Sequence, residues 1–254
     1  MVFPYPSCFF QETMYTESQR LTTGGFFMRT TDSKRIFSPV NLLLSVLGFC
    51  FILSFSVVFI LNFRPIYYHD MTAMDLAERY QMPEEEIRAN YDALIDYNSL
   101  FFRGELHFPT LPMSEEGRIH FEEVKRIFDG LQILLILSAV CFFPLAFYQL
   151  RRHKNRGFLL LMPVITAVIA GLTGILSVVN WEWFFTAFHH VLFRNDYWLF
   201  DPDTDPIINL LPDEFFFHCL MGILAMVAGL LLLSLAGYVL PQHVHRARAP
   251  KKNS

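Results

Sequence analysis

The stretch "PVNLLLSVLGFCFILSFSVVFILN", residues 39–62, contains no charged side chain and gives the strongest indication of fold class. A helix needs about 20 mostly apolar residues to cross the hydrocarbon core of a membrane, and this stretch is long enough. The composition of the whole chain agrees, because 53% of the residues are hydrophobic and Phe alone occurs 28 times. The sequence therefore predicts an integral membrane protein rather than a soluble domain.

Further apolar runs follow, and their only acidic, basic or histidine side chains, Asp129 and His218, lie near the ends of their runs. This pattern is the one a membrane requires, because a charge at mid-bilayer costs several kcal/mol. The four expected spans are residues 39–62, 128–150, 157–180 and 215–240. We therefore predict an all-α integral membrane fold, a single domain over residues 39–240. Polar helical or loop segments at 63–127 and 181–214 would cap the bundle.

Charge in the connecting segments predicts the orientation. The hairpin "RRHKNR" (151–156) has four basic residues and no acidic one, and so does the tail "HVHRARAPKKNS" (243–254). The segments 63–127 and 181–214 instead carry thirteen and seven acidic residues against seven and one basic residues. Because short loops rich in Lys and Arg stay in the cytoplasm, we expect both termini inside and both long segments outside. The protein would then be a multi-pass membrane protein with its two long outer segments on the extracytoplasmic face.

The first 38 residues precede the first span. We do not expect them to be a cleavable signal peptide, because the apolar run starts late and no cleavage site follows it. They are expected to form a disordered cytoplasmic arm, or to reflect a start site upstream of Met28. Residues 241–254 form a basic cytoplasmic tail.

The first outer segment predicts short helices and then a helix that enters the membrane. Thr72 with Asp75 matches a capping box, and Pro83 stands at a first helical position before three glutamates. Further along, Ser114 is expected to cap a helix that runs through His120 into the second span. His120 then lies one to two turns above the hydrocarbon edge.

A second histidine reaches the same level from the other outer segment. "WEWFFTAFHHVLF" (181–193) is aromatic enough to lie in the membrane interface, which brings His189 level with His120. Imidazole titrates near neutrality and can act as base and then as acid, so this pair suits proton transfer. His190, His107 and His218 are rival candidates, since spacing alone does not choose among them.

Metal-dependent and nucleophile signatures are missing. The chain has no HExxH, no GxSxG and no glycine-rich phosphate loop. "DPDTD" (201–205) imitates the start of a calcium loop, but Pro206 stands where that loop needs glycine. We expect the aspartate–proline pairs to form turns instead. No metal site and no cofactor are predicted.

Several motifs together carry a family resemblance. They are "NYDALIDYN" (90–98), "FPTLPMSEEGRIHFEEVKRIF" (108–128) and "FHHVLFRNDYWLFDPDTDPIINLLPDEFF" (188–216). With the four-span layout, they resemble the bacterial integral membrane family that includes the lipoprotein intramolecular transacylase of Gram-positive bacteria. The likeness runs in order from about Ile36 to Leu240.

The resemblance implies an acyltransferase that moves the sn-2 acyl chain of a diacylglyceryl-cysteine onto the α-amine of the same cysteine, giving a lyso-form lipoprotein. By motif, the two central histidines of the family match His120 and His189. The expected donors to the tetrahedral intermediate and substrate are Arg194, Asn195, Tyr197 and Trp198. No cofactor is implied.

The expected partners are a diacylated lipoprotein and membrane lipid, with no nucleic acid, and the protein is expected to be a monomer. Two other function classes remain open at this point. One is a non-enzymatic scaffold or sensor, and the other is a different lipid-modifying enzyme. Transport is disfavoured because the spans offer almost no polar path through the bilayer.

Overall fold

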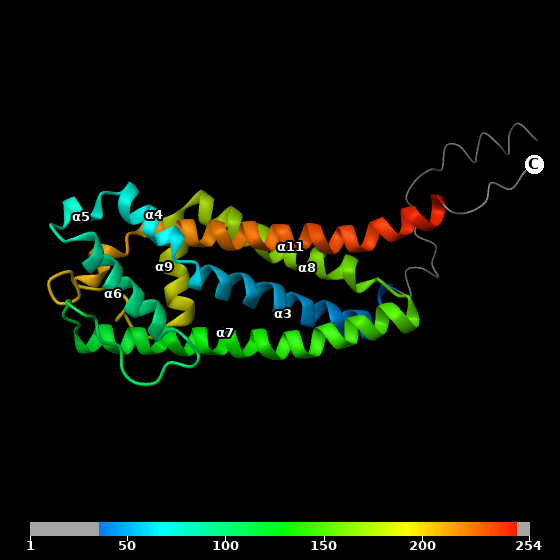
Figure 1. The fold of residues 1–254 in the computed structure, drawn as a ribbon, viewed down its shortest axis with the longest axis horizontal. Coiled ribbons are helices and arrows are strands. Elements are labelled where there is room, and N and C mark those ends of the chain that lie inside the picture. The colour runs from blue at the N-terminus through cyan, green and yellow to red at the C-terminus, as the bar shows by residue number, and fades with distance from the viewer. Residues whose placement is uncertain (1–35, 248–254) are drawn as a thin grey trace, which may run out of the picture.

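The computed structural model describes residues 36–247, and this part of the chain is helical with no strand (Figure 1). The long helices run side by side along the molecule. They are α3 (Pro39–Asn62), α7 (Glu115–Tyr148), α8 (Phe158–Val179) and α11 (Asp213–Ala247). All four are long and apolar enough to cross a membrane. The predicted all-α, four-span fold class is therefore confirmed. The predicted arm lies mostly outside the described residues, as does the end of the basic tail.

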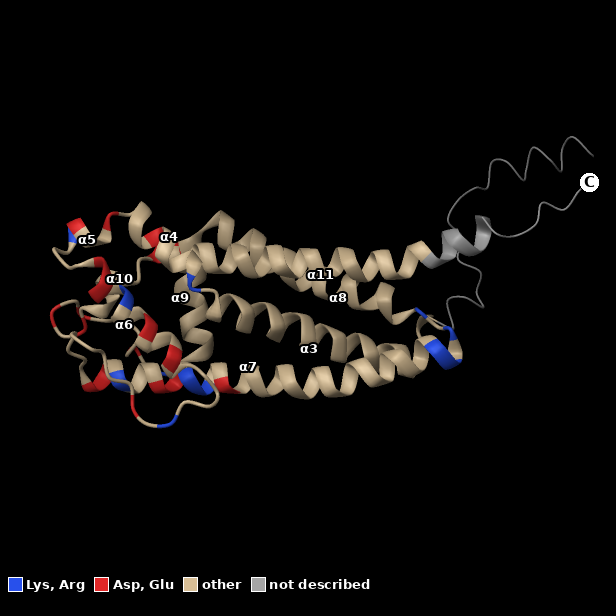
Figure 2. Ribbon diagram, viewed as in Figure 1, with Lys and Arg blue, Asp and Glu red and all other residues tan. Residues whose placement is uncertain are grey.

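The remaining helices divide between the two ends of the bundle. At one end lies a group that we call the cap: α4 (Pro65–Ala73), α5 (Leu76–Arg79), α6 (Glu84–Tyr97), α9 (Trp181–Leu192) and α10 (Ile207–Leu210). At the other end, the π-helical turn η1 (Gln149–His153) leads into the hairpin between α7 and α8. In Figure 2, this hairpin carries only basic charge, whereas acidic residues gather in the cap.

Helix α3 is the central element of the bundle and contacts α7, α8 and α11. It begins where Ser38 caps it, with the hydroxyl accepting a hydrogen bond from the Asn41 backbone N–H and Pro39 at the first helical position. Gly48 permits its close approach to α8, because a Cβ there would collide with Met162. Large apolar side chains on the outer faces of the bundle are exposed, as expected for surfaces that meet lipid tails.

Buried amides join the helices at the hairpin end. The Asn41 side chain donates hydrogen bonds to the Ile36 carbonyl (3.0 Å) and to Asn155 Oδ1 (3.1 Å). Gln149 Nε2 in turn donates to Asn41 Oδ1. This network ties the start of α3 to the hairpin.

The cap has its own hydrophobic core, which fixes it to the bundle. Tyr67 of α4 stacks on Tyr91 of α6 with 3.7 Å between ring centroids, and its hydroxyl donates to the Leu210 carbonyl. A buried carboxylate adds a polar link, since Asp70 Oδ2 lies 2.9 Å from Nδ1 of His218 on α11. The cap is thus a packed layer that can hold side chains in fixed positions.

Two local predictions in this layer are wrong. Thr72 already lies inside α4, where its hydroxyl donates to the Tyr68 carbonyl, so it cannot form a capping box with Asp75. Asp75 has a left-handed backbone and makes no capping hydrogen bond. Pro83 precedes α6 as its N-cap instead of occupying the first helical position. The predicted cap at Ser114 is confirmed, with its hydroxyl accepting from the Gly117 N–H at 2.9 Å.

Candidate active site

His120 is held in place by the first turn of α7 and by the turn before α10. The Asp205 carboxylate accepts a hydrogen bond from the Ser114 N–H at 2.8 Å, so it holds the start of the helix. Gly117 is required at this contact, because a Cβ there would collide with the Asp205 carboxylate. The packing brings the Phe200 ring to 5.4 Å from the His120 ring. His120, one turn further along α7, is thereby buried.

His189 approaches from α9, which runs across the bundle end rather than along it (Figure 1). Asn180 separates α8 from α9 and caps α9, accepting a hydrogen bond from the Trp183 N–H at 2.9 Å. On this helix His189 is buried, and its ring centroid lies 6.3 Å from that of His120. His190 is exposed. The structure therefore brings His189, and not His190, to His120.

Aromatic side chains enclose the histidine pair. Phe193 lies against both rings, 4.7 Å from His120 and 5.7 Å from His189. Trp198 stacks on His189 at 4.6 Å, and Phe185 lies at 4.2 Å. Such walls limit the access of water and strengthen electrostatic interactions inside the site. Phe185 and Phe193 could not be predicted as site residues, because nothing in a run of aromatic residues shows which ones face inward.

One hydrogen bond fixes the tautomer of His189. Its Nδ1 lies 2.7 Å from the Phe185 carbonyl oxygen, and a carbonyl can only accept, so Nδ1 carries the proton. In the neutral ring, Nε2 is then free to accept a proton. Burial lowers the pKa of His189 below its ordinary value, an effect that the hydrogen bond to Phe185 opposes. The neutral ring therefore predominates at neutral pH.

The lowered pKa of His189 predicts a pH dependence of stability. The unfolded chain binds the proton more readily, so stability is full above the ordinary imidazole pKa and is lost as the pH falls through the folded-state pKa. We expect His189→Asn to flatten the fall in Tm as the pH drops below the ordinary imidazole pKa of about 6.5, with each kcal/mol worth about 2–4 °C. Thermal unfolding of the purified protein measures this, with His190→Asn as control. Equal pH slopes in wild type and His189→Asn would refute it.

Two buried nitrogens at the site have no hydrogen-bond partner among the described residues. They are Nδ1 of His120 and Nε1 of Trp198. Buried polar groups are almost always paired, and each exception asks for an explanation. Both belong to the enclosure around His189, so they can form hydrogen bonds to a ligand that enters it.

The other residues expected to bind substrate are placed differently. Asn195 is partly buried, but its amide nitrogen already donates to Glu123 at 3.1 Å and its carbonyl oxygen accepts from the Tyr197 N–H. Arg194 and Tyr197 are exposed. Of the rival histidines, His107 is exposed and His218 pairs with Asp70.

The aspartate–proline segment forms turns, as the residue types predict. Asp201 accepts hydrogen bonds from the Asp203 N–H at its carboxylate and from the Asp205 N–H at its carbonyl. Within residues 36–240, whose side chains the structure describes, no group of three or more His, Cys, Asp or Glu side chains is arranged to hold a metal ion. The segment thus serves to seat Asp205 and Phe200 on α7.

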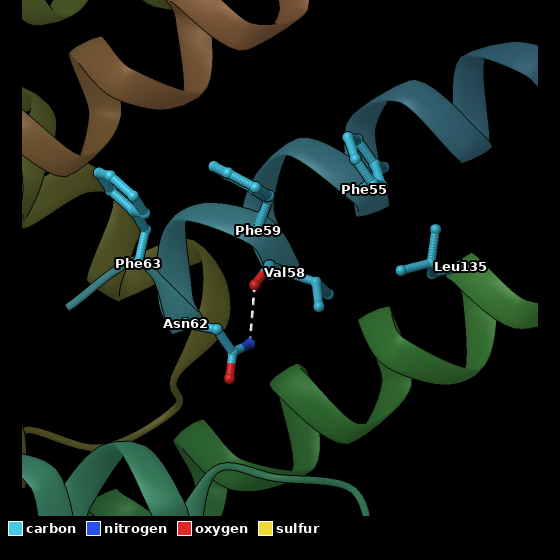
Figure 3. A pocket seen from close by; sticks show the side chains of 6 residues that line it. All are labelled: Phe55, Val58, Phe59, Asn62, Phe63 and Leu135. Atoms are coloured by element: carbon cyan, nitrogen blue, oxygen red, sulfur yellow. Dashed lines mark hydrogen bonds between the residues drawn. The ribbon is translucent and has the colours of Figure 1, made fainter. Parts of the chain in front are cut away.

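An apolar groove opens between α3 and α7 towards the cap end of the bundle. Figure 3 shows its lining side chains, which come from α3, from Phe63 directly after it and, at Leu135, from α7. The residues are Phe55, Val58, Phe59, Asn62, Phe63 and Leu135, and the cavity volume is about 320 Å³. Except for Asn62, which hydrogen-bonds its own helix at Val58, the lining is wholly hydrocarbon. The groove can therefore take an alkyl chain.

Comparison with known proteins gives one consistent result. The family model described as lipoprotein intramolecular transacylase Lit matches residues 42–216. The membrane integral lipoprotein intramolecular transacylase Lit from Bacillus cereus is 34% identical, with a TM-score of 0.79 over 82% of this chain and 96% of that one. A variant of it, with a histidine replaced by arginine, gives 30% identity and a TM-score of 0.74 over 94% and 99%. In a further variant the replacement is alanine, with 30% identity and a TM-score of 0.72 over 92% and 99%. No curated protein sequence matches.

Proposed function

The chain belongs to the lipoprotein intramolecular transacylase family, and we propose that it moves the sn-2 acyl chain of a diacylglyceryl-cysteine to the α-amine of that cysteine, with His120 and His189 as the catalytic pair. The observation that carries this proposal is the enclosed contact between the two imidazoles, 6.3 Å apart by their ring centroids. A lyso-form lipoprotein is the product.

The reaction needs a proton taken from one atom and given to another. The neutral amine attacks the ester carbonyl, a C–N bond forms, the sn-2 C–O bond breaks, and the amine proton ends on the sn-2 oxygen. His189 takes the proton at Nε2, because its Nδ1 donates to Phe185. His120 passes the proton on, accepting at one ring nitrogen and donating from the other, so that its buried ring need not hold a charge.

Positioning supplies much of the remaining rate. Because the nucleophile and the ester belong to one molecule, holding them in attack geometry replaces an encounter of two reactants. The tetrahedral intermediate carries a developing negative charge that a fixed donor stabilises. Trp198 Nε1 is the donor best suited to this role, since it is buried, unpaired and beside His189.

The membrane sets where the substrate binds. With the basic hairpin in the cytoplasm, both termini lie inside and the cap faces the extracytoplasmic side, where the peptide of the lipoprotein is. The apolar groove between α3 and α7 takes an acyl chain of the diacylglyceryl group. We propose a monomer, since both histidines and the groove belong to one chain and the site needs no residue from a second copy.

An isotope crossover experiment tests the proposed reaction. The purified protein is given equal amounts of a diacyl lipopeptide with light acyl chains and the same lipopeptide with heavy acyl chains. We expect N-acylated products that each keep both of their own chains, since the transfer is intramolecular. Products of mixed isotope content, or of added acyl mass, would instead indicate transfer between molecules and would contradict the proposal.

A further inference from the structure

Glu123 is a partly buried carboxylate of α7 without a basic partner. The other acidic residues of this part of α7 that pair do so with Arg or Lys: Glu115 with Arg118, Glu122 with Arg118 and Arg126, and Asp129 with Lys125. Glu116 is exposed to solvent. Among the described residues, no Arg or Lys pairs with Glu123. Within the described part of the chain, its carboxylate oxygens accept only from Asn195 Nδ2, at 3.1 and 3.2 Å.

Its helix spacing and its hydrogen-bond partner both place Glu123 close to the histidine pair. It lies three residues after His120 on α7, and residues with this spacing share a helix face. Its partner Asn195 lies in the short segment between Phe193, which contacts both histidine rings, and Trp198, which stacks on His189. The carboxylate is thus at the edge of the enclosure in which the amine must react.

A partly desolvated carboxylate with one neutral donor is incompletely compensated. A cation would compensate it, and a charge-assisted hydrogen bond is roughly twice as strong as a neutral one. The substrate brings such a cation, because the α-amine of a mature lipoprotein is largely protonated at neutral pH. We propose that Glu123 binds the α-ammonium of the substrate's terminal cysteine and holds the nucleophile beside the histidine pair. This inference rests on the proposed function.

Binding at Glu123 is compatible with the loss of a proton from the amine. The α-ammonium gives one proton to water before the attack, and the neutral amine that remains still has N–H groups that can donate to the Glu123 carboxylate. Glu123 can therefore hold the amine in either protonation state.

One substitution separates this role from a purely structural one. Glu123→Gln keeps a side-chain oxygen that can accept from Asn195 and removes the negative charge. Glu122→Gln is the matched control, since Glu122 is the neighbouring carboxylate but pairs with Arg118 and Arg126. Neither change removes a histidine or Trp198.

The test compares the binding of two synthetic diacyl lipopeptides, one with a free α-amine and one with an acetylated amine, to the protein in lipid nanodiscs. Every protein in the binding test carries His189→Ala, so that the free-amine peptide is not converted while it binds. In this background we expect the protein with native Glu123, and its Glu122→Gln variant, to bind the free amine about tenfold more tightly, which is 1.4 kcal/mol. In Glu123→Gln this preference is lost, while binding of the acetylated peptide is unchanged.

Two outcomes overturn the inference. One is a preference that survives in Glu123→Gln, and the other is an equal loss of binding for both peptides, which would indicate a structural role. Conversion of the free-amine peptide by wild type is measured in parallel. If wild type fails to convert it, the proposed function itself fails, so the two failures are distinguishable.

Discussion

Replacing His189 by alanine is expected to slow acyl migration by about 10²–10⁴-fold, the usual contribution of general acid–base catalysis. The reason is the loss of the Nε2 atom that takes the amine proton, while the aromatic enclosure remains. Conversion of a diacyl lipopeptide by the purified variant measures the loss. We expect His120→Ala to lose a similar factor, and the double variant to lose little more, because the two rings serve one proton path.

The matched control for His189 is its neighbour. His190→Ala removes an exposed ring from the same turn of α9, and we expect it to retain the wild-type rate within a few-fold. His107→Ala plays the same part for His120, since His107 is exposed in a loop of the cap. Comparable losses in His189→Ala and His190→Ala would contradict the assignment of His189. Thermal unfolding of all variants shows whether they are folded.

Replacing Trp198 by phenylalanine is expected to lower kcat by about 10²-fold, within the range found when one donor to an oxyanion is removed. Phenylalanine keeps an aromatic ring against His189 but lacks the indole N–H. Because that N–H would bond the developing negative charge and not the resting ester, KM should change much less than kcat. Steady-state kinetics on the diacyl lipopeptide gives both constants.

The chain offers a close control for this substitution. Trp181 also has a buried Nε1 without a partner, but it lies at the start of α9 against Phe184, Phe185 and Phe217. Trp181→Phe should therefore leave kcat nearly unchanged. Equal effects of the two substitutions would show that the indole N–H groups act on stability and not on the intermediate.

Much of the fold could be predicted from the sequence, because the bilayer core admits few kinds of backbone structure. An uncharged run such as residues 39–62 has to form a helix that satisfies its own backbone, and the helix α3 is the result. The N-cap of α7 at Ser114 could also be predicted, since its side chain accepts a hydrogen bond from the helix that directly follows it. The predicted N-cap at Thr72 was wrong because α4 includes this residue. The length of α4 depends on tertiary packing of its buried residues Tyr67 and Met71, which local sequence does not show.

The candidate site could be predicted only in part. Charge and apolar length bring His120 and His189 to one level, but depth says nothing about direction around a helix axis. The choice between His189 and His190 depends on which face of α9 packs towards Trp198 and His120. These contacts form only in the folded protein, because His120 is distant in sequence from Phe193 and α9. Glu123 was missed for a similar reason. A carboxylate among the charges of α7 becomes distinctive only when the structure shows which of its neighbours are paired.

Tandem mass spectrometry of a synthetic diacyl lipopeptide incubated with the purified protein tests the proposed acyl migration most directly. Acyl migration makes an isomer, so we predict an unchanged intact mass. The fragment spectrum should show one acyl chain linked as an amide to the α-amine of the cysteine and one chain left on the glycerol. The His120→Ala, His189→Ala double variant should leave both chains on the glycerol. An unchanged lipopeptide with the wild type would contradict the proposed acyl migration. Equal conversion by the double variant would contradict the role of the two histidines.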